Sequence, residues 1–436
     1  MRRPARRALR RRPRPPPPAG PGRARLTSSA FHTDHYELTM LDAALASGMA
    51  DRPVVFEVFT RALPAGRRYG VFAGLGRLLD ALEDFRFGPA ETEWLAARGF
   101  LSERALEWLA AYRFSGDVLA YEEGELYTGG SPVMTVTGTF AETVLLETLV
   151  LSVLNHDSAV ASAASVVSAA AGDRPVIEMG GRRTDPEAAV AAARAAYIGG
   201  LASTSNLEAG RRYGLPTAGT SAHAFVLLFD EERDAFDAQV SVLGPSTTLL
   251  VDTYDTAAGI RNAVEAAGPD LGAVRIDSGD LAVEAVRARA LLDSLGAWRS
   301  RVVVTGDLDE DSIGRLAALP VDGFGAGTRV VMGAGQPTSG FVYKLVEVGG
   351  RAVAKKSPGK ATVGGRKTAW RVASDASEVV TADPAGPAPV GGRPLQVEAV
   401  SAGVRRPGAD VDAARARHSA SRLELGPDRS LQLERR

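Results

Sequence analysis

The sequence Ala273-Val274-Arg275-Ile276-Asp277-Ser278-Gly279-Asp280 shows the unit that repeats through residues 176–332. A short apolar run ends in a polar cluster, and an Ala-rich or charged segment of helical character follows. Strands that alternate with helices indicate a parallel sheet, and the active sites of such folds lie at the carboxyl ends of the strands. This stretch therefore predicts a catalytic α/β barrel or an open α/β sheet.

Six polar clusters mark the expected strand ends. Each follows or closes an apolar run, as residues 248–251 and 302–304 illustrate. The clusters are residues 178–183, 219–223, 252–255, 275–280, 305–307 and 325–328. Helices are expected over residues 185–198, 205–213, 256–267, 281–295 and 309–319.

The composition is that of a globular enzyme. The 436 residues can form two or three domains, and 45% of them are hydrophobic, which suffices for a large core. There is no cysteine, so disulfides, cysteine-ligated zinc and thiol nucleophiles are excluded. No apolar run approaches the length of a transmembrane helix. We therefore expect a soluble, cytoplasmic protein without a membrane partner.

Charge is distributed unevenly along the chain. Residues 1–25 hold ten arginines and no acidic residue, with consecutive prolines from Pro15 to Pro18. Such a segment cannot bury a core, so residues 1–26 are expected to form a disordered Arg/Pro-rich extension. Because the whole chain has a net charge of −1, the rest of it carries −11. An acidic body does not favour nucleic-acid binding.

The patterns outside the repeating stretch indicate a second domain. Short strands such as residues 54–59 stand between helical segments, and residues 341–348 alternate like an antiparallel strand that turns at Gly349-Gly350. The expected divisions are residues 27–150 for an N-terminal α+β domain, 151–345 for the α/β barrel, and 346–436 for C-terminal segments that pack on the N-terminal domain.

A polar triplet stands in the longest apolar helical stretch, residues 141–170. Asn155, His156 and Asp157 interrupt it, and polar groups in a buried helix need hydrogen-bond partners. We favour a satisfied core network or a helix junction at this point over a functional site.

His223 is the most notable single residue. It is one of five histidines and follows Gly219-Thr220-Ser221 at an expected strand-to-helix turn. A lone histidine is usually structural, but a position among polar strand ends favours a role as base, nucleophile or phospho-acceptor. Asp252 or Asp255 could hold the tautomer of its imidazole, as carboxylates do in catalytic triads.

Arginines at two strand ends favour an anionic substrate. Arg182 and Arg183 stand together in one cluster, and the strand period of two places Arg275 and Asp277 on one side of another. A guanidinium can bind a carboxylate or a phosphate through two hydrogen bonds. A solvated turn and a structural ion pair are the alternative interpretations, and for Arg275 and Asp277 the sequence does not separate the two.

Two glycine-containing turns are typical of phosphate binding. Thr305-Gly306-Asp307 and Gly325-Ala326-Gly327-Thr328 offer backbone N–H groups where helices begin. Together with the arginines they imply a substrate with several phosphates. Asp277, Asp280 and Asp307 could hold Mg²⁺ with its waters. The sequence contains no P-loop and no Gly-x-Gly-x-x-Gly between a strand and a helix.

These motifs, specific in combination, resemble the nicotinate phosphoribosyltransferases, a family of type II phosphoribosyltransferases. The resemblance extends from about residue 33 to residue 367 and weakens beyond. The motifs that carry it are Thr33-Asp34-His35-Tyr36-Glu37-Leu38-Thr39-Met40, Gly180-Gly181-Arg182-Arg183, Thr204-Ser205-Asn206, Gly219-Thr220-Ser221-Ala222-His223, Arg275-Ile276-Asp277-Ser278-Gly279-Asp280, Gly325-Ala326-Gly327-Thr328 and Lys356-Ser357-Pro358-Gly359-Lys360.

The resemblance implies a reaction and a fold. Nicotinate and 5-phosphoribosyl 1-pyrophosphate would give nicotinate mononucleotide and pyrophosphate in NAD salvage, with Mg²⁺ and with ATP hydrolysis coupled through a phosphohistidine. The implied fold is an irregular α/β barrel with an N-terminal α+β domain completed by C-terminal segments. The implied assembly is a homodimer whose sites lie at the subunit interface.

The resemblance also assigns residues to roles. His223 matches the histidine that ATP phosphorylates, and Asp252 and Asp277 are the expected catalytic carboxylates. The positions that match nicotinate contacts are Tyr36, which would come from the partner subunit, Thr220 and Arg275. The positions expected to bind 5-phosphoribosyl 1-pyrophosphate are Arg182, Gly306, Asp307, Gly327 and Thr328.

Two rival functions stay open. A nicotinamide phosphoribosyltransferase resembles the chain in barrel layout and in the histidine, but carries Asp where Asn206 falls. An amide substrate needs an acceptor for its NH₂, whereas a carboxylate needs donors such as Ser205 or Asn206, so Asn206 is assigned to nicotinate binding. The second rival is a non-catalytic phosphate-binding barrel, and the joint presence of His223, Arg275 and Asp277 argues against it.

Overall fold

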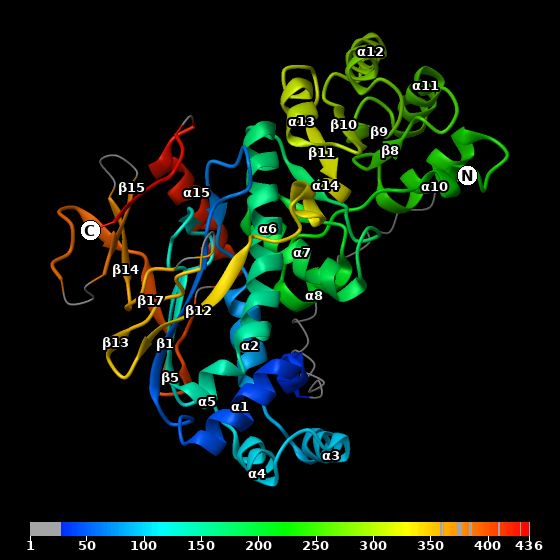
Figure 1. Cartoon of the computed structure of the whole chain (residues 1–436). Helices are drawn as coiled ribbons and strands as arrows, with labels where there is room; N and C mark the ends of the chain where they lie inside the picture. The colour runs from blue at the N-terminus through cyan, green and yellow to red at the C-terminus, as the bar shows by residue number, and fades with distance from the viewer. Residues whose placement is uncertain are drawn as a thin grey trace, which may run out of the picture.

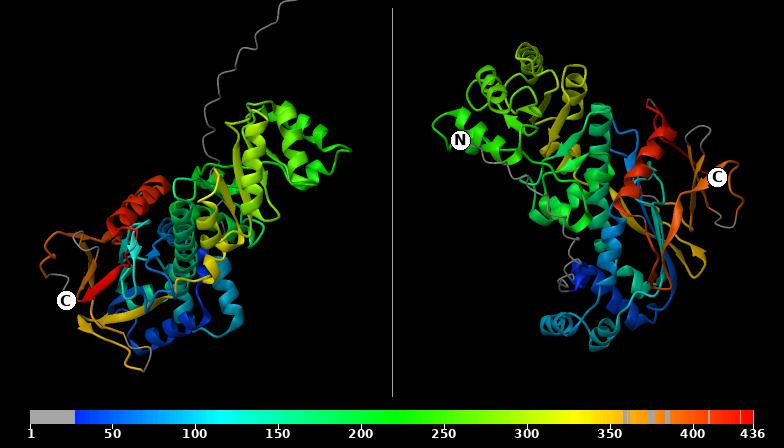
Figure 2. Two further views of the ribbon diagram at one scale, coloured as in Figure 1. Left: turned by 90° about the horizontal axis from the view of Figure 1, so that it is seen from above. Right: turned by 180° about the vertical axis from the view of Figure 1, so that it is seen from behind.

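Helix α6 (Glu147–Ala171) runs between the two halves of the molecule (Figure 1). A parallel sheet with its helices lies on one side, and an antiparallel sheet and a smaller mixed sheet that includes the end of the chain lie on the other (Figure 2). The computed structural model describes residues 28–357, 360, 362–372, 377–382, 386–408, 410–427 and 429–435. The expected extension, residues 1–26, lies outside the described residues.

The barrel half contains a parallel sheet in the order β7-β6-β11-β10-β9-β8. Its strands are β6 (Val176–Glu178), β7 (Ser203–Thr204), β8 (Thr248–Leu250), β9 (Ala273–Ile276), β10 (Arg301–Gly306) and β11 (Gly323–Ala326). An isolated parallel bridge from Thr204 to Thr217 adds one more segment beside β7. Within the described residues no backbone hydrogen bond joins this segment to β8. The predicted irregular α/β barrel is therefore confirmed as an open half-barrel.

The turns that end the strands also start the helices. These helices are α7 (Pro186–Ile198), α8 (Leu207–Tyr213), α9 (His223–Val226), α10 (Glu232–Leu243), α11 (Thr256–Ala267), α12 (Leu281–Ser294), α13 (Glu310–Leu316) and α14 (Thr328–Val331). Side chains that accept backbone N–H groups at their first turns are Asp185, Asn206, Asp255, Asp280 and Asp309. Two polar residues of the predicted clusters, Asp255 and Asp280, are thus helix caps, which satisfy N–H groups without a partner in the helix.

Strands from both ends of the chain form the larger antiparallel sheet, in the order β13-β12-β1-β5-β3-β17-β18. Before the barrel come β1 (Pro53–Thr60), β3 (Asp117–Tyr121) and β5 (Met134–Thr139), and after it come β12 (Phe341–Val348), β13 (Arg351–Ala352), β17 (Gln396–Ser401) and β18 (Val404–Arg405). C-terminal segments therefore complete the N-terminal domain. Because β12 pairs with β1 from Phe341 onward, the expected division after residue 345 falls inside a strand of this sheet.

Helices and a smaller sheet cover this domain. The helices are η1 (Ser29–His32), α1 (His35–Ser47), α2 (Leu75–Glu83), α3 (Pro89–Arg98), α4 (Glu103–Ala111), α5 (Phe140–Val144), η2 (Gly333–Gly335) and α15 (Val411–Leu425). The smaller sheet comprises β14 (Thr368–Val372), β15 (Ser377–Thr381), β16 (Gly392–Pro394) and β19 (Gln432–Arg435), while β2 (Gly70–Val71) pairs with β4 (Leu126–Tyr127). Two large apolar cores result, one in the barrel and one around residues such as Phe85 and Tyr121, and a small third cluster includes Val190 and Leu215.

Helix α6 is long and apolar enough, by length and composition, to cross a membrane, and among the described residues it is the one helix of this kind. No uninterrupted apolar run of that length stands in the sequence, because serines and the polar triplet divide the apolar positions of α6 into short runs. In the fold, 67% of its most apolar window is buried inside the protein. That degree of burial is typical of a core helix.

The polar triplet does not interrupt α6. The Asn155 side chain accepts the Phe341 N–H at 2.8 Å and donates to the Phe341 carbonyl at 3.2 Å. Its amide therefore satisfies both backbone polar groups of the first residue of β12. Asp157 is fully buried and accepts from Arg77 on α2 at 2.7 Å, and its carboxylate lies 2.9 Å from Nδ1 of His156. These contacts form a core network within a continuous helix, as favoured above, but Oδ2 of Asp157 is buried without a hydrogen-bond partner among the described residues.

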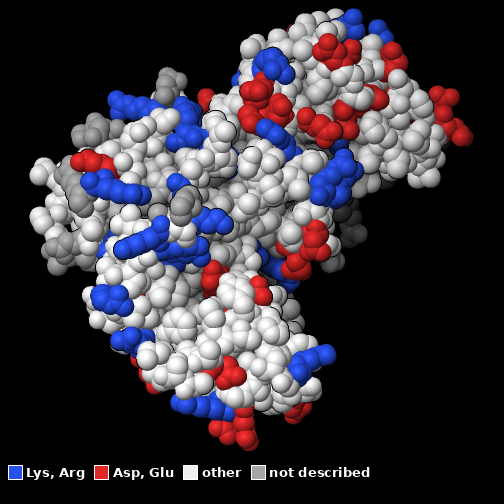
Figure 3. All heavy atoms as spheres, viewed as in Figure 1, with Lys and Arg blue, Asp and Glu red and all other residues white. Residues whose placement is uncertain are grey.

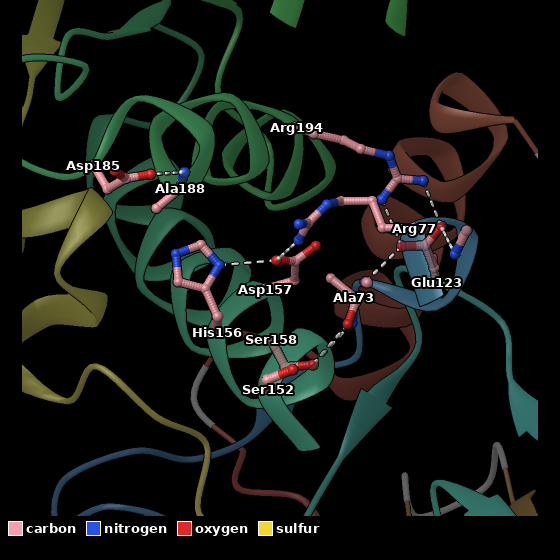
Figure 4. A network of polar contacts seen from close by, with 12 residues as sticks. Ala73, Arg77, Glu123, Ser152, His156, Asp157, Ser158, Asp185, Ala188 and Arg194 are labelled. Atoms are coloured by element: carbon pink, nitrogen blue, oxygen red, sulfur yellow. Dashed lines mark hydrogen bonds and ion pairs between the residues drawn. The ribbon is translucent and has the colours of Figure 1, made fainter. Parts of the chain in front are cut away.

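A buried ion pair links the two halves of the molecule (Figure 4). Glu123, between β3 and β4, accepts from Arg194 on α7 through both carboxylate oxygens, at 2.7 and 2.6 Å. It also accepts the Gly74 N–H at 2.6 Å. Burial raises the pKa of Glu123, but the Arg194 charge and these hydrogen bonds outweigh burial and lower it. The carboxylate is therefore ionised, and removing its partner would leave a buried charge unpaired.

Arg194→Met should lower the free energy of unfolding by ~3–5 kcal/mol, because the substitution keeps the bulk of the side chain and leaves Glu123 without its cation. Urea unfolding followed by circular dichroism measures this loss. Arg212→Met is the matched control, because Arg212 pairs with Glu187 and Glu208 at the exposed surface, where ion pairs contribute little. Equal losses in the two variants would contradict the interpretation.

The C-terminal helix α15 packs against α7 and contacts α6 through a buried histidine. His418 is 1% exposed, and its Nε2 lies 2.8 Å from Oγ of Ser165, which also contacts the Tyr69 hydroxyl at 2.9 Å. Burial, with the nearby charges of Arg422 and Arg415, lowers the pKa of His418 to about 3. The folded protein therefore holds this imidazole neutral at physiological pH.

Acid should destabilise the protein through His418. The unfolded chain binds a proton there below about pH 6.5, whereas the folded chain does not, so the free energy of unfolding falls by up to ~1.4 kcal/mol per pH unit as the pH decreases from 6.5 towards 3. His418→Gln should remove this component, because its amide can still bond Ser165 without titrating. Urea unfolding at pH 7 and pH 5 measures it, with the exposed His32→Gln as control. The same pH slope in wild type and His418→Gln would refute it.

Candidate active site

The Arg275 guanidinium connects three strand ends of the half-barrel. The side chain is 16% exposed and donates from Nε to Oγ1 of Thr305 on β10 at 3.0 Å. Nη1 donates to Oγ1 of Thr220 at 3.1 Å and to the Ser221 carbonyl at 3.2 Å. Nη2 donates to Oδ1 of Asp277 at 3.0 Å. A planar guanidinium suits this position because it donates in several directions at once.

The half-barrel is open between the segment that begins at Thr217 and strand β8, and we call this opening the seam. Side chains bridge the seam. The segment beside β7 continues into Thr220, which Arg275 contacts from β9. A second contact across the seam joins Nδ1 of His223 to Oγ1 of Thr253, 3.1 Å apart. Thr253 follows β8, the opposite edge strand. The predicted nicotinate-contacting pair Thr220 and Arg275 and the predicted phospho-acceptor therefore come together at this seam.

The aspartates expected beside His223 have other partners. Thr253 occupies the position at its imidazole, so the predicted pairing of His223 with Asp252 or Asp255 is wrong. Oδ2 of Asp252 accepts the Asp277 N–H at 2.8 Å and the Ser278 hydroxyl at 2.6 Å. Asp255 caps α11. The sequence placed all these residues at strand ends, but spacing alone does not determine which side chains face each other.

Asp277 is an ionised carboxylate at the centre of these contacts. Burial raises its pKa, but a hydrogen bond from the Thr305 hydroxyl and the donor and charge of Arg275 hold the pKa below its usual value. Oδ1 of Asp252 and Oγ of Ser221 are buried and have no hydrogen-bond partner among the described residues. Buried polar atoms are almost always paired, so such atoms indicate a ligand or water partner.

The turns predicted to bind phosphate lie at the ends of adjacent strands, β6, β11 and β10. Arg182 and Asp307 are exposed in the turns after β6 and β10. Gly306 has a φ of +146°, a conformation that side chains rarely adopt. Gly327 precedes α14, which begins at Thr328. These five residues therefore stand along one edge of the sheet, as predicted.

Asn206 caps α8 and presents its amide nitrogen to a neighbouring turn. Oδ1 accepts the Ala209 N–H at 2.9 Å. Nδ2 faces Gly181, since a Cβ on that glycine would lie 3.8 Å from it. In the part of the chain that the structure describes, Nδ2 has no hydrogen-bond partner. The amide thus offers donors beside the predicted phosphate turn.

Two contributors were missed by sequence reasoning. Thr253 stands in a predicted cluster, but no role was assigned to it. Glu178 is the last residue of β6 and is 1% exposed, and burial raises its pKa despite hydrogen bonds from Thr204 and Gly180. A charged residue that closes an apolar strand was the available signal for Glu178.

Tyr36 does not lie with the barrel residues within one chain. It stands on α1, at the opposite end of the molecule from β8, β9 and β10 (Figures 1 and 2). Its side chain is 43% exposed. Burial of part of the ring and the nearby charges of Glu147 and Glu37 raise its pKa, so the phenol is neutral.

The acidic residues at this edge fit a cation carried by a substrate better than a resident metal. Among the described residues no three His, Asp or Glu side chains are grouped to hold a metal ion. Asp280, one of the expected ligands, caps α12. Mg²⁺ commonly binds through one or two carboxylates together with substrate phosphates. Asp277 and the unpartnered Oδ1 of Asp252 fit that mode of binding. On the face in Figure 3, acidic side chains gather over the barrel helices.

Two family models match consecutive stretches of the chain. Residues 31–155 match the nicotinate phosphoribosyltransferase (NAPRTase) N-terminal domain, and residues 160–332 match the quinolinate phosphoribosyl transferase, C-terminal domain. Both models describe domains of phosphoribosyltransferases.

Relatives that match most of the chain identify the kind of phosphoribosyltransferase. Nicotinate phosphoribosyltransferase pncB1 of Mycobacterium tuberculosis is 56% identical over 416 residues, 92% of each chain. Nicotinate phosphoribosyltransferase of Bacillus subtilis is 35% identical over 360 residues, 79% of this chain and 73% of that protein. Human nicotinic acid phosphoribosyltransferase superposes with a TM-score of 0.79 and 26% identity, over 92% of this chain and 97% of the human chain. The chain belongs to the nicotinate phosphoribosyltransferase family.

Arg275→Ala should loosen the seam, because it removes the hydrogen bonds to Thr220 and Ser221. Amide hydrogen exchange should become faster in residues 218–226 and stay unchanged in the N-terminal domain. Arg301→Ala is the matched control, since Arg301 is an exposed arginine on the neighbouring strand. Unchanged exchange in residues 218–226 would show that other contacts hold the seam.

Proposed function

We propose that the protein transfers a phosphoribosyl group from 5-phosphoribosyl 1-pyrophosphate to nicotinate, forming nicotinate mononucleotide and pyrophosphate for NAD salvage. The observation that carries this proposal is the Arg275–Asp277 pair at the seam, which sets a cation for the acid substrate beside a carboxylate for the ribose. The names of the relatives agree with it.

The chemistry follows from these groups. The bond from ribose C1 to the pyrophosphate oxygen breaks, and the pyridine nitrogen bonds to C1 with its own lone pair, so no general base is needed. Positive charge develops at the ribose in the transition state. The ionised carboxylate of Asp277, oriented through the backbone by Asp252, stabilises that charge. Mg²⁺ bound to the substrate would neutralise the leaving pyrophosphate.

The pyridine carboxylate has donors on two sides in this proposal. Arg275 donates four of its five guanidinium N–H groups to Thr305, Thr220, Ser221 and Asp277, so one N–H remains for the substrate, and the Thr220 hydroxyl stands 3.1 Å from Nη1. The Asn206 amide adds Nδ2. On the phosphate side, the donors are Arg182 and the turns at Gly306-Asp307 and Gly327-Thr328. An acid substrate meets donors throughout, whereas a carboxamide would set its own N–H groups against them.

ATP coupling is proposed to run through His223. Because Nδ1 is engaged by Thr253, Nε2 is the nitrogen that can attack the γ-phosphoryl group, giving phosphohistidine and ADP. The added negative charge lies at the seam, close to Arg275 and the Asp277 network. Its attraction for the guanidinium would draw the two edges together and favour the closed site, until water hydrolyses the phosphohistidine.

A second copy of the chain is proposed to complete the site. Tyr36 is too distant to reach the seam of its own chain, and its half-exposed ring suits stacking on a pyridine. Large apolar side chains are also exposed on the barrel, and such surfaces mark interfaces. They include Leu227, Leu228, Val242 and Leu243, which are 56–80% exposed. A homodimer that pairs α1 of one subunit with the barrel of the other accounts for the position of Tyr36 and for the exposed apolar side chains.

The test is an assay of nucleotide formation with nicotinate or nicotinamide as acceptor, each with and without ATP. We expect turnover of nicotinate, stimulated by ATP, and a kcat/KM for nicotinamide at least ~10-fold lower, as unpaired polar groups discriminate. His223→Ala should lose the stimulation by ATP and the phosphohistidine signal, with His32→Ala as control.

Each other outcome has a defined meaning. Preference for nicotinamide would favour the first rival and leave the phosphoribosyl chemistry in place. Binding of 5-phosphoribosyl 1-pyrophosphate without turnover of either acceptor would favour the non-catalytic barrel. Full ATP stimulation in His223→Ala would remove the phosphohistidine from the proposal.

A further inference from the structure

Thr305 is a buried threonine between two groups of the proposed reaction. It stands near the carboxyl end of β10 and is 2% exposed. Its Oγ1 accepts from Nε of Arg275 at 3.0 Å and donates to Oδ1 of Asp277. A hydroxyl has one proton and an ionised carboxylate only accepts, so the direction of both hydrogen bonds is fixed. No step of the proposed reaction assigns a role to this hydroxyl.

The sheet holds the Thr305 side chain in one orientation. Val304 pairs with Ile276 on β9, so the next residues, Thr305 and Asp277, are neighbours. On the other side, Thr305 pairs with Gly325 on β11. A Cβ on Gly325 would lie 2.6 Å from Cγ2 of Thr305, so the methyl group of the threonine occupies the space of the missing side chain. The β-branched side chain is stiff at χ1, and its hydroxyl is therefore directed towards β9.

The hydrogen bonds of Asp277 leave one carboxylate oxygen available. Oδ1 accepts from both the Thr305 hydroxyl and Nη2 of Arg275, the latter at 3.0 Å. Among the residues that the structure describes, Oδ2 has no hydrogen-bond partner, and the Asp277 side chain is 33% exposed. Two donors on one oxygen orient the carboxylate, so Oδ2 is the oxygen that can face a substrate.

The same hydroxyl restricts the Arg275 guanidinium. Its Nε is bound by Thr305, and the two N–H groups of Nη1 are bound by Thr220 and Ser221. Nη2 gives one N–H to Asp277. A planar group that is held at all three nitrogens cannot rotate. The last N–H, on Nη2, therefore has a fixed direction beside the carboxylate.

We propose that Thr305 is a positioning residue that joins Arg275 and Asp277 into one rigid unit, and that this unit presents Oδ2 of Asp277 to the ribose and the last N–H of Arg275 to the pyridine carboxylate. The inference rests on the proposed function and names the atoms that would meet the substrates. Thr305 acts through its two neighbours and does not touch a substrate. Loss of its hydroxyl would release both neighbours at once.

The test compares kinetic constants for nucleotide formation from nicotinate. Thr305→Val replaces the hydroxyl with a methyl group of similar size, so it removes both hydrogen bonds and keeps the packing against Gly325. We expect kcat to fall at least about tenfold, the effect of one hydrogen bond to a charged group, and KM for nicotinate to rise. KM for ATP should stay unchanged, because Oγ1 of Thr305 bonds Arg275 and Asp277 rather than His223. Thr305→Ser keeps the hydroxyl and should restore most of the activity.

Thr60→Val is the matched control. Thr60 is also 2% exposed, and its hydroxyl donates to the Ala62 carbonyl at 2.8 Å in the N-terminal domain. The substitution removes a hydrogen bond of an equally buried threonine without a change at the site. Both kcat and KM for nicotinate should stay at their wild-type values. The melting temperatures of the two valine variants measure how much stability each hydroxyl contributes.

A second pair of variants tests the orientation by Gly325. Gly325→Ala places a methyl group against Cγ2 of Thr305, so it should displace the hydroxyl and lower kcat. Thr305→Ser lacks Cγ2 and makes room for that methyl group. The double variant should therefore be more active than Gly325→Ala alone, a sign of direct coupling between neighbours. Additive losses would contradict this orientation.

Three results would overturn the inference. An unchanged kcat in Thr305→Val would show that Arg275 and Asp277 keep their positions without the hydroxyl, and the proposed function would stand. Equal losses of kcat in Thr305→Val and Thr305→Ser, or a KM for ATP that rises together with KM for nicotinate, would show a general structural role. A wild-type protein that forms neither nucleotide would overturn the proposed function itself, and this inference with it.

Discussion

The hydrogen bonds of the Arg275 guanidinium across the seam are the interaction on which the site depends. The parallel sheet is open between its outer segment and β8, so among the residues that the structure describes no backbone ladder holds Thr220 near β9. One side chain does so, while it also fixes Thr305 and the carboxylate of Asp277. A lysine in the same place would be a point charge on a flexible stem and could not bond all of these groups in one plane.

The seam is also where the half-barrel differs from a closed barrel in its mechanics. In a closed barrel each strand end has a hydrogen-bonded neighbour on both sides. Here the segment of Thr220 and the end of β8 are held across the seam by side chains of Arg275 and His223, which in the proposed function also contact a substrate or a phosphoryl group. The rigid contacts lie elsewhere, in the Glu123–Arg194 pair and in the buried face of α6. Buried contacts behind the sheet and side-chain contacts at its open edge would suit the closure of the site that is proposed above.

The sequence predicts the parts of this protein that follow from local chemistry. Apolar runs that end in polar clusters identify the barrel strands, and Asp or Asn before a helical segment identifies caps such as Asn206. It does not predict which strand ends face each other, because that depends on the curvature of the sheet. For this reason the sequence did not predict that Thr253, rather than Asp252, lies beside His223, or that Glu178 bonds Thr204. The continuous helix through Asn155 was missed because its partner, the backbone of Phe341, is far away in the sequence.

The mixed origin of the antiparallel sheet has a consequence for how the chain is made. β1 has β5 on one side within the first third of the chain, but its other neighbour, β12, leaves the ribosome only after the whole barrel has been synthesised. One edge of β3 likewise stays unpaired until β17 has been synthesised. The barrel can therefore fold while the N-terminal domain still has two unpaired strand edges, which are surfaces that bind other strands. Vectorial synthesis thus lets the barrel fold before the domain that emerged first is complete, because the last hundred residues supply the missing strands of that domain.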